Sequence, residues 1–404
     1  MEAELYGQWE EHGSVLWLRP STQAPKTSPV LGFDMDGCLI ETKSGRKFAT
    51  GRSDWQWLDE AIPAKLRDCH QKGQTLVIFS NQGGINGSGG YDAAKAEMMR
   101  GMVSDLVHSL GVPLHAMLAT TADTCRKPAT GMWDLFSSQT GHEKLSLFVG
   151  DAAGRPEHWA PGRPKDFSCS DRKFAHNTGA EFYTPEEFFF DATPAPFTWD
   201  GLSPADVAAL LSPAPSPPCL TRPSTARSPE MVIIVGPPAS GKSTLCKRHF
   251  PQVSCMSFGC VVSWWVGVGD PTQYVHVNRD KLRTMDACIQ AADVGLKSGK
   301  SVVVDNTNPS VQARENFLAL ARRHSVETRC IHMDMPDAVV KHLNFYRERL
   351  TQGETPHIPR VAYAIYDKNY EKPTAEEGFA SVVMVPWTPH FTSATQRESF
   401  GQLA

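Results

Sequence analysis

The sequence has no apolar run of the roughly 20 residues that a membrane-spanning helix needs. Its first segment, Met1–Pro20, also lacks the basic stretch followed by an apolar stretch that is typical of a secretory signal. These two absences argue against a membrane protein and against a secreted one. We therefore expect no membrane partner and a cytoplasmic or nuclear location.

Closely spaced cysteines and an excess of positive charge are missing too. The ten cysteines are scattered singly, without a Cys-x-x-Cys pair or a Cys/His spacing suited to zinc, and we interpret them as reduced thiols. The formal net charge of −4 excludes a globally basic surface. Any nucleic acid is therefore expected to bind in local basic clefts.

Prolines crowd together in one region of the chain, 193–229. Such a density sustains neither a helix nor a central strand, although Ser203-Pro204 predicts a short capped helix within Trp199–Leu211. A chain of 404 residues is long enough for two domains on either side of this region. We expect an N-terminal extension at 1–29, a first domain at 30–192, a linker at 193–229 and a second domain at 230–404.

Apolar strand-like runs alternate with helical patterns on both sides of the linker, which predicts parallel sheets flanked by helices. The fold class is therefore α/β with two domains. The predicted strands are Val30–Phe33, Thr75–Phe79, Ser146–Val149, Met231–Val235, Tyr274–Val277, Ser301–Val304 and Thr328–His332. The predicted helices are Tyr91–Leu110, a helix from Lys242 onward, Asp280–Ser298, Ser310–His324 and Asp337–Leu350.

Two carboxylates, Asp34 and Asp36, follow the first predicted strand. Ligands of open α/β sheets bind at this edge. The spacing suits phosphoryl transfer, in which Asp34 attacks phosphorus and Asp36 protonates the leaving oxygen and then activates water. By itself, Asp-x-Asp-Gly is equally compatible with a calcium loop or a plain turn.

Further polar residues end the next strands. Ser80-Asn81-Gln82 offers hydroxyl and amide donors for phosphoryl oxygens, Lys127 a cation for the transition state, and Asp151 a carboxylate to hold magnesium with Asp34. Asp171 is either a further acidic site residue or a helix cap. Seven basic residues either line the rim of this site or form a solvated face: Lys43, Arg46, Lys47, Arg163, Lys165, Arg172 and Lys173.

These four strand-end motifs together resemble those of the haloacid dehalogenase phosphatase superfamily, and the first domain is expected to have its Rossmann-like fold. The resemblance implies a Mg²⁺ ion held by Asp34, Asp36 and Asp151. Cys38 stands where that superfamily usually has threonine. No large cap is inserted between the motifs, so the site is expected to admit bulky substrates.

The second domain begins with a phosphate-binding signature. Gly236-Pro237-Pro238-Ala239-Ser240-Gly241-Lys242-Ser243-Thr244 matches G-x-x-x-x-G-K-[ST] between a predicted strand and a predicted helix. We expect backbone N–H groups to wrap the phosphates of ATP, Lys242 to span its β and γ groups, and Ser243 to ligate Mg²⁺. The expected nucleotide-binding residues are Gly236, Ser240, Gly241, Lys242, Ser243 and Thr244.

Three further residues are expected to complete this kinase site. Asp280 is placed to take the proton of an attacking hydroxyl or, alternatively, to cap the following helix. Asp305 is a candidate for the water shell of Mg²⁺. Arg347, with Arg349, is a candidate for a lid that clamps the donor phosphates.

Together the two halves resemble the polynucleotide kinase 3′-phosphatase family in its animal arrangement. The resemblance covers nearly all of 30–404, and its most discriminating stretches are 131–133, 149–155, 159–163, 165–169, 184–189 and 277–280. It implies removal of 3′-phosphate and phosphorylation of 5′-hydroxyl groups at DNA breaks, or at equivalent RNA ends, with Mg²⁺ and ATP. It also implies a nuclear location, with a cytoplasmic or mitochondrial fraction as the alternative.

Two features depart from the family. The segment before Val30 is too short for the forkhead-associated domain that binds phosphorylated scaffold proteins, so no such partner is predicted. The chain is also longer between Phe250 and Thr272, where it carries the apolar run Val261–Val266. Two rival hypotheses are a small-molecule phosphatase fused to a metabolite kinase, and a scaffold with a vestigial ATP site.

Overall fold

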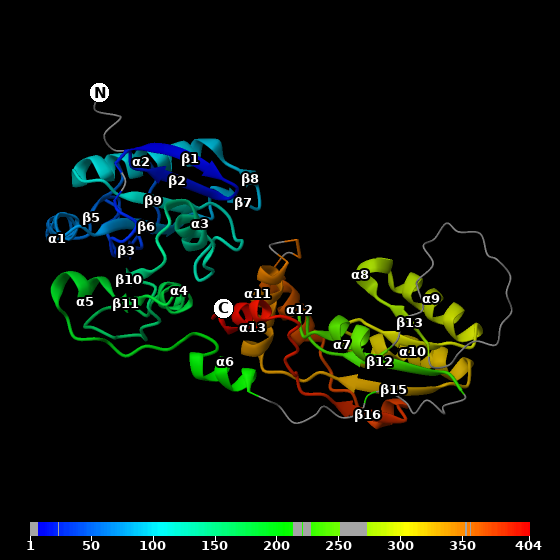
Figure 1. Cartoon of the computed structure of the whole chain (residues 1–404). Helices are drawn as coiled ribbons and strands as arrows, with labels where there is room; N and C mark the ends of the chain where they lie inside the picture. Colours follow the sequence, from blue (N-terminus) through cyan, green and yellow to red (C-terminus); the bar gives the residue numbers. More distant parts are fainter. Residues whose placement is uncertain are drawn as a thin grey trace. The chain divides into compact units, whose positions relative to one another are not determined.

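The computed structural model describes residues 7–22, 24–212, 220, 228–250, 273–351, 354–355 and 357–404. Backbone contacts divide the chain into two units. The first comprises Met1–Val207 with Glu348–Thr355 and Glu398–Ala404, and the second comprises Ala208–Arg347 with Pro356–Arg397 (Figure 1). No helix in the described ranges is long and apolar enough to cross a membrane.

A seven-stranded sheet forms the centre of the first unit. In spatial order its strands are β1 (Gln8–His12), β2 (Val15–Arg19), β9 (His115–Ala119), β6 (Thr75–Asn81), β3 (Val30–Phe33), β10 (Leu145–Val149) and β11 (Glu181–Tyr183). The five strands from β9 to β11 are parallel, as predicted, whereas β2 pairs antiparallel with both β1 and β9. The segment predicted as an N-terminal extension therefore contributes two strands to this sheet.

Helices cover both faces of this sheet. They are α1 (Ala61–Gln71), α2 (Ala93–Leu110), α3 (Gly131–Thr140), α4 (Ser170–Thr178) and α5 (Pro185–Phe190), and two short hairpins add β4 (Ile40–Glu41) with β5 (Gln56–Trp57) and β7 (Asn86–Gly87) with β8 (Gly90–Tyr91). Side chains alternate between the faces of a strand, so Leu31 and Phe33 pack with α1 and α2, while Val30 packs with α3 and α4. Both faces are buried, which holds the strand ends rigidly.

The second unit contains a five-stranded, fully parallel sheet. Its spatial order is β13 (Tyr274–Val277), β14 (Ser301–Val304), β12 (Glu230–Val235), β15 (Glu327–His332) and β16 (Ser381–Met384). Ile233 and Val235 pack on one face with α9 and α10, while Val232 and Ile234 pack on the other with α7. The remaining elements of the chain are α7 (Lys242–His249), α8 (Arg279–Leu282), α9 (Met285–Lys297), α10 (Val311–Arg323), α11 (Asp337–Leu350), α12 (Arg360–Asn369), η1 (Ala375–Glu377) and α13 (Ala394–Gly401). The ends of α11 and α13, from Glu348 and from Glu398, belong to the first unit.

One predicted helix is interrupted. The segment Asp280–Ser298 forms α8 and α9 rather than a single helix, because Arg283 adopts a left-handed φ of 71° and the side chain of Thr284 caps α9 by accepting from Ala287 N. This break leaves α8 as a short element that follows directly on β13.

The predicted linker is only partly described. Its short helix is confirmed as α6 (Pro204–Leu211), with Ser203 and Asp206 bonded reciprocally at its start. Leu220 is buried against the core of the second unit, and its carbonyl accepts from the Arg329 guanidinium. The remaining linker residues 213–219 and 221–227, and the apolar run Val261–Val266, lie outside the described residues.

Candidate active sites

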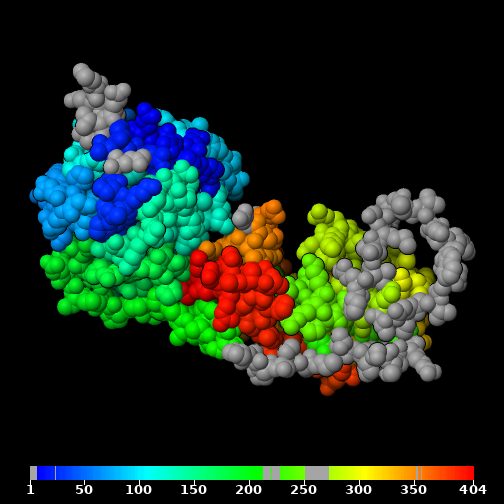
Figure 2. Space-filling model, viewed as in Figure 1, coloured from blue at the N-terminus to red at the C-terminus, as the bar shows by residue number. Residues whose placement is uncertain are grey.

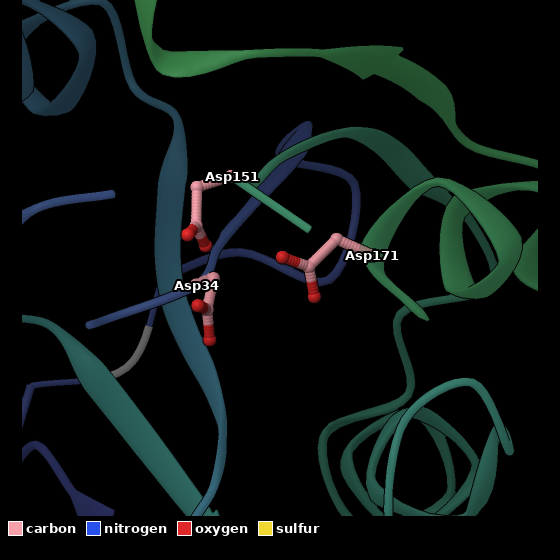
Figure 3. Close-up of side chains that lie close together, drawn as sticks. All are labelled: Asp34, Asp151 and Asp171. Carbon is pink, nitrogen blue, oxygen red and sulfur yellow. The ribbon is translucent and has the colours of Figure 1, made fainter. Parts of the chain in front are cut away.

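Three aspartates meet at the carboxyl edge of the first sheet. Asp34 follows β3, Asp151 follows β10, and Asp171 lies in the first turn of α4. One carboxylate oxygen from each lies within 4.8 Å of the others (Figure 3). Neighbouring parallel strands bring the first two together, since the backbone N–H of Asp34 donates to the carbonyl of Val149 at 2.8 Å. Oxygen ligands in this arrangement fit a hard divalent cation such as Mg²⁺.

The position of Asp171 decides between its two predicted roles. Helix α4 begins at Ser170 with Cys169 in the capping position, so Asp171 is not the cap. Its buried carboxylate instead accepts from Ala152 N at 3.0 Å and belongs to the three-aspartate group. The structure thus brings Asp171 into the site.

Two glycines allow these carboxylates to approach the backbone. Gly37 has a φ of +78°, and a Cβ on it would lie 2.7 Å from Oδ2 of Asp151. A Cβ on Gly150 would lie 2.4 Å from Oδ2 of Asp171. Both separations are too short for a side chain, so the two positions require glycine.

Lys127 supplies the positive charge at the centre of the group. Its Nζ lies 2.6 Å from Oδ1 of Asp34 and 2.8 Å from Oδ1 of Asp171. Burial by itself would lower the pKa of Lys127, but the charges of Asp171 and Asp34 outweigh burial and raise that pKa. The ammonium is therefore held charged where a phosphoryl group would meet Asp34.

Asn81 is bonded to the backbone of Lys127. Its side-chain amide donates to the carbonyl of Lys127 at 3.1 Å, and its side-chain oxygen accepts from the N–H of Lys127 at 2.9 Å. These two bonds hold the backbone of Lys127. Asn81 therefore positions Lys127.

Asp36 lies beside the three-aspartate group, but its side chain is not part of it. The Gln82 amide donates to Oδ2 of Asp36 at 2.7 Å and to Oγ of the buried Ser80 at 2.9 Å. Burial, together with the charge of Asp34, raises the pKa of Asp36 to about 6. A carboxyl group with such a pKa suits proton transfer near neutral pH. The role of Asp36 as a metal ligand stays a prediction.

Negative charge exceeds positive charge at this edge. Burial, followed by the charges of Asp34 and Asp171, raises the pKa of Asp151 well above its ordinary value. A single lysine therefore does not compensate the three carboxylates. A divalent cation would supply the missing charge and keep all three ionised.

Some of the basic residues predicted at the rim point inward. Arg172 Nε donates to the carbonyl of Ala153 at 2.9 Å, and Lys173 Nζ donates to the carbonyl of Asp200 at 2.8 Å. Lys47 is different, because its ammonium lies 3.6 Å from the ring centre of Phe167, which is 82% exposed. Arg172 and Lys173 therefore support the loops rather than face a substrate.

The second site lies at the carboxyl end of β12. The loop from Gly236 leads into α7, which begins at Lys242, and Ala239 and Gly241 have φ values of 60° and 87°. Lys242 Nζ donates to the carbonyls of Pro237 at 2.6 Å and Gly236 at 3.1 Å, and to Oγ of the buried Ser240 at 3.3 Å. Ser243 and Thr244 are exposed in the first turn of α7. The loop thus has the form of a phosphate cradle at a helix N-terminus.

The charges around Lys242 come from the other predicted residues. Burial lowers the pKa of Lys242 to about 8, the charges of Asp305 and Asp280 oppose that shift, and Arg347 on α11 adds to it. All three residues therefore lie within electrostatic reach of the cradle. The site gathers Lys242 with two carboxylates and one guanidinium.

Asn278 organises the acceptor side of this site. Its amide donates to Oδ2 of Asp305 at 2.8 Å, while its side-chain oxygen caps α8 by accepting from Lys281 N. Asp280 is exposed in the first turn of α8, so its alternative role as the helix cap is wrong. No role of Asn278 was predicted, although its place directly after the predicted strand Tyr274–Val277 was an available signal.

The two units match two different family models of known proteins. Residues 29–189 match the family model described as polynucleotide kinase 3 phosphatase, and residues 231–359 match the one described as an AAA domain. A bifunctional polynucleotide phosphatase/kinase of Schizosaccharomyces pombe is 34% identical over 390 residues, which are 96% of this chain and 86% of the relative. A putative bifunctional polynucleotide phosphatase/kinase of Acanthamoeba polyphaga mimivirus is 30% identical over 88% of this chain and 84% of the relative.

A third relative matches a smaller part. A polynucleotide 3′-phosphatase of Arabidopsis thaliana is 30% identical over 49% of this chain and 29% of its own length. The first two relatives span both units of this chain and are matched over most of their own length. The chain therefore belongs to the family of bifunctional polynucleotide phosphatase/kinases.

Proposed function

We propose that this chain removes 3′-phosphate from polynucleotide ends and phosphorylates their 5′-hydroxyl groups with ATP. The observation that carries the first half is the convergence of Asp34, Asp151 and Asp171 around Lys127 at one sheet edge. The second half rests on the cradle that holds Lys242 at the end of β12. Family membership joins the two activities in one chain.

In the phosphatase reaction, Asp34 attacks phosphorus and the leaving 3′-oxygen takes a proton from Asp36. Lys127 stays charged and stabilises the negative charge of the transferring group. Asp36 then accepts a proton from the water that hydrolyses the phosphoaspartate. Asp34, Asp151 and Asp171 would hold Mg²⁺, which stabilises charge on the phosphoryl oxygens when bound.

In the kinase reaction, the backbone of 236–244 and Lys242 bind the phosphates of ATP. Asp280 accepts the proton of the attacking 5′-hydroxyl, and Arg347 stabilises charge on the transferred group. Ser243 and Asp305 are the residues suited to hold Mg²⁺. The natural substrates are DNA ends or equivalent RNA ends, and the site of action for DNA is the nucleus.

The test is a dual assay on a nicked duplex that carries a 3′-phosphate and a 5′-hydroxyl. We expect Asp34→Ala to abolish only phosphate release and Asp280→Ala to abolish only 5′-labelling. Activity restricted to a panel of sugar phosphates would instead indicate the small-molecule enzyme. A parent protein that never labels 5′-ends would favour the scaffold with a vestigial ATP site.

A further inference from the structure

Two cations lie over two consecutive glycines beside the phosphatase site. A Cβ on Gly83 would lie 2.8 Å from Nη1 of Arg126, and a Cβ on Gly84 would lie 2.2 Å from Nζ of Lys95. Neither glycine has a left-handed φ, so their backbone conformation is open to other residues. A side chain at either position would displace the cation that lies over it.

The place of these glycines links them to the reacting centre. They follow Gln82 directly, and the Gln82 amide bonds to Asp36. Arg126 directly precedes Lys127, and burial lowers the pKa of Arg126 while the charge of Asp34 opposes that shift. Arg126 is therefore within electrostatic reach of Asp34. Lys95, on α2, lies over Gly84, one residue beyond Gly83.

Neither cation has a carboxylate partner among the described residues. Other basic side chains of this unit do: Arg155 binds Asp166 and Glu186, and Arg52 binds Asp105. Partial burial of the Arg126 guanidinium without a carboxylate in contact is unfavourable in the free protein. An arriving anion would remove that cost.

The surface beside Lys95 has room for a polymer backbone. A hollow of about 590 Å³ runs along the β7–β8 hairpin, and half of its eight lining residues are glycine: Gly84, Gly87, Gly89 and Gly90, with Ser88, Tyr91, Asp92 and Ala93. This hairpin is exposed and lies in the light-blue surface of Figure 2. Because half of its lining residues are glycine, a sugar–phosphate chain can approach the protein backbone closely.

We propose that Arg126 and Lys95 bind the internucleotide phosphates that precede the scissile 3′-phosphate. Arg126, nearer to Asp34, takes the first of them and Lys95 the next. This inference rests on the proposed 3′-phosphatase function and deepens it. It predicts that the site favours the end of a polynucleotide over a mononucleotide, since contacts to backbone phosphates position the strand.

The experiment compares kcat/KM for a 3′-phosphorylated decathymidylate and for thymidine 3′-monophosphate, which has no internucleotide phosphate. We expect Lys95→Ala to lower the value for the oligonucleotide roughly tenfold and to leave that for the mononucleotide unchanged. The slope of log kcat/KM against log salt concentration should become shallower by about 0.7, the value for one phosphate contact to a single strand.

A second variant and a matched control separate phosphate binding by Lys95 from the mere loss of a positive charge and from unfolding. Gly84→Ala keeps both cations but displaces Lys95 Nζ, and it should reproduce the selective loss on the oligonucleotide. Lys144→Ala removes an exposed lysine next to the amino end of β10, the opposite edge of the sheet, and should change neither value.

The outcomes distinguish this inference from the proposed function. Suppose that the wild-type chain hydrolyses both substrates and that the ratio of the two kcat/KM values is the same in Lys95→Ala and Gly84→Ala as in wild type. That result overturns the inference alone. Equal losses on both substrates also overturn it, because they indicate damage at the reacting centre. A wild-type chain that hydrolyses neither substrate overturns the proposed function, and the inference with it.

Discussion

The side-chain amide of Asn278 lies 2.8 Å from Oδ2 of Asp305, and the oxygen of the same amide caps α8. One side chain thereby orients a carboxylate that influences Lys242 and starts the helix that carries Asp280. The two functions of Asn278 use different atoms, so substitutions can separate them.

Asn278→Asp should keep the helix cap but place a second carboxylate against Asp305. Because like charges at that distance repel, we expect 5′-kinase activity to fall at least about tenfold, the effect of 1.4 kcal/mol in the barrier. Asn278→Ala should lose kinase activity and also about 1 kcal/mol of stability from the missing cap. Rates of 5′-labelling and 3′-phosphate release measure the first effect, and chemical denaturation measures the second. Normal labelling by Asn278→Asp would contradict the role assigned to this contact.

Lys127→Met should abolish phosphatase activity and destabilise the first unit. The substitution leaves Asp34, Asp151 and Asp171 without their buried cation, for which we expect a loss of about 3–5 kcal/mol in the free energy of unfolding. Added Mg²⁺ should restore much of this stability but not the activity. Thermal unfolding with and without Mg²⁺ tests this, with Lys144→Met as the matched surface control. A variant that Mg²⁺ does not stabilise would argue against a cation site at these aspartates.

Cys38 offers a test of the hydroxyl that related phosphatases usually carry. Its fully buried thiol donates to the carbonyl of Val149 at 3.4 Å, a weak hydrogen bond that supports the start of the Asp34 loop. Cys38→Thr replaces the thiol with a stronger donor, and we expect stability to rise by roughly 0.5–1 kcal/mol with phosphatase activity retained. In the control variant Cys38→Val, the new side chain has nearly the same shape as threonine but no hydrogen-bond donor. If the two variants have equal stability, the hydrogen bond contributes nothing measurable.

His115 should make the first unit sensitive to acid. Burial, with smaller contributions from Arg19 and His142, lowers its pKa from 6.5 to about 3, while its Nδ1 accepts from Trp17 Nε1 at 3.2 Å. The unfolded chain therefore binds a proton first as the pH falls. The contribution of neutral His115 to the free energy of unfolding is complete above pH 6.5 and is lost progressively toward pH 3.

His115→Gln keeps an acceptor for Trp17 and removes this titration. We expect the free energy of unfolding of wild type to fall, relative to that of the variant, by roughly 1 kcal/mol for each pH unit below 6.5. Urea unfolding at several pH values measures it. A difference that stays constant from pH 7 to pH 4 would show that His115 is not neutral and buried in the folded state.

Much of the phosphatase site followed from sequence because its residues are tied to strand ends. Asp34 and Asp151 follow apolar runs that are buried on both faces, and parallel strands bring their carboxyl ends to one edge. The same reasoning located Lys242 and Asp305 in the second unit. Strand ends were thus predictable without knowledge of side-chain contacts.

Other features depended on contacts between segments far apart in the chain. Asp171 enters the site from α4, and sequence left it equally compatible with a helix cap. The Gln82 amide binds the Asp36 carboxylate across the sheet edge, a contact that no local pattern predicts. Strand β2 joins the sheet by pairing antiparallel with β9, and β1 pairs antiparallel with β2; the predicted extension at 1–29 contained no recognised signal for either strand.

The sequence by itself determined the two α/β halves, the order of their motifs and the residues at each strand end, because apolar periodicity and Gly-rich turns are local properties. Only the tertiary structure decided which carboxylates face Lys127, that Asn81 holds its backbone, and that Arg126 and Lys95 lie over Gly83 and Gly84. Those relationships depend on how helices pack across a sheet, and side-chain packing is a property of the whole fold rather than of any segment.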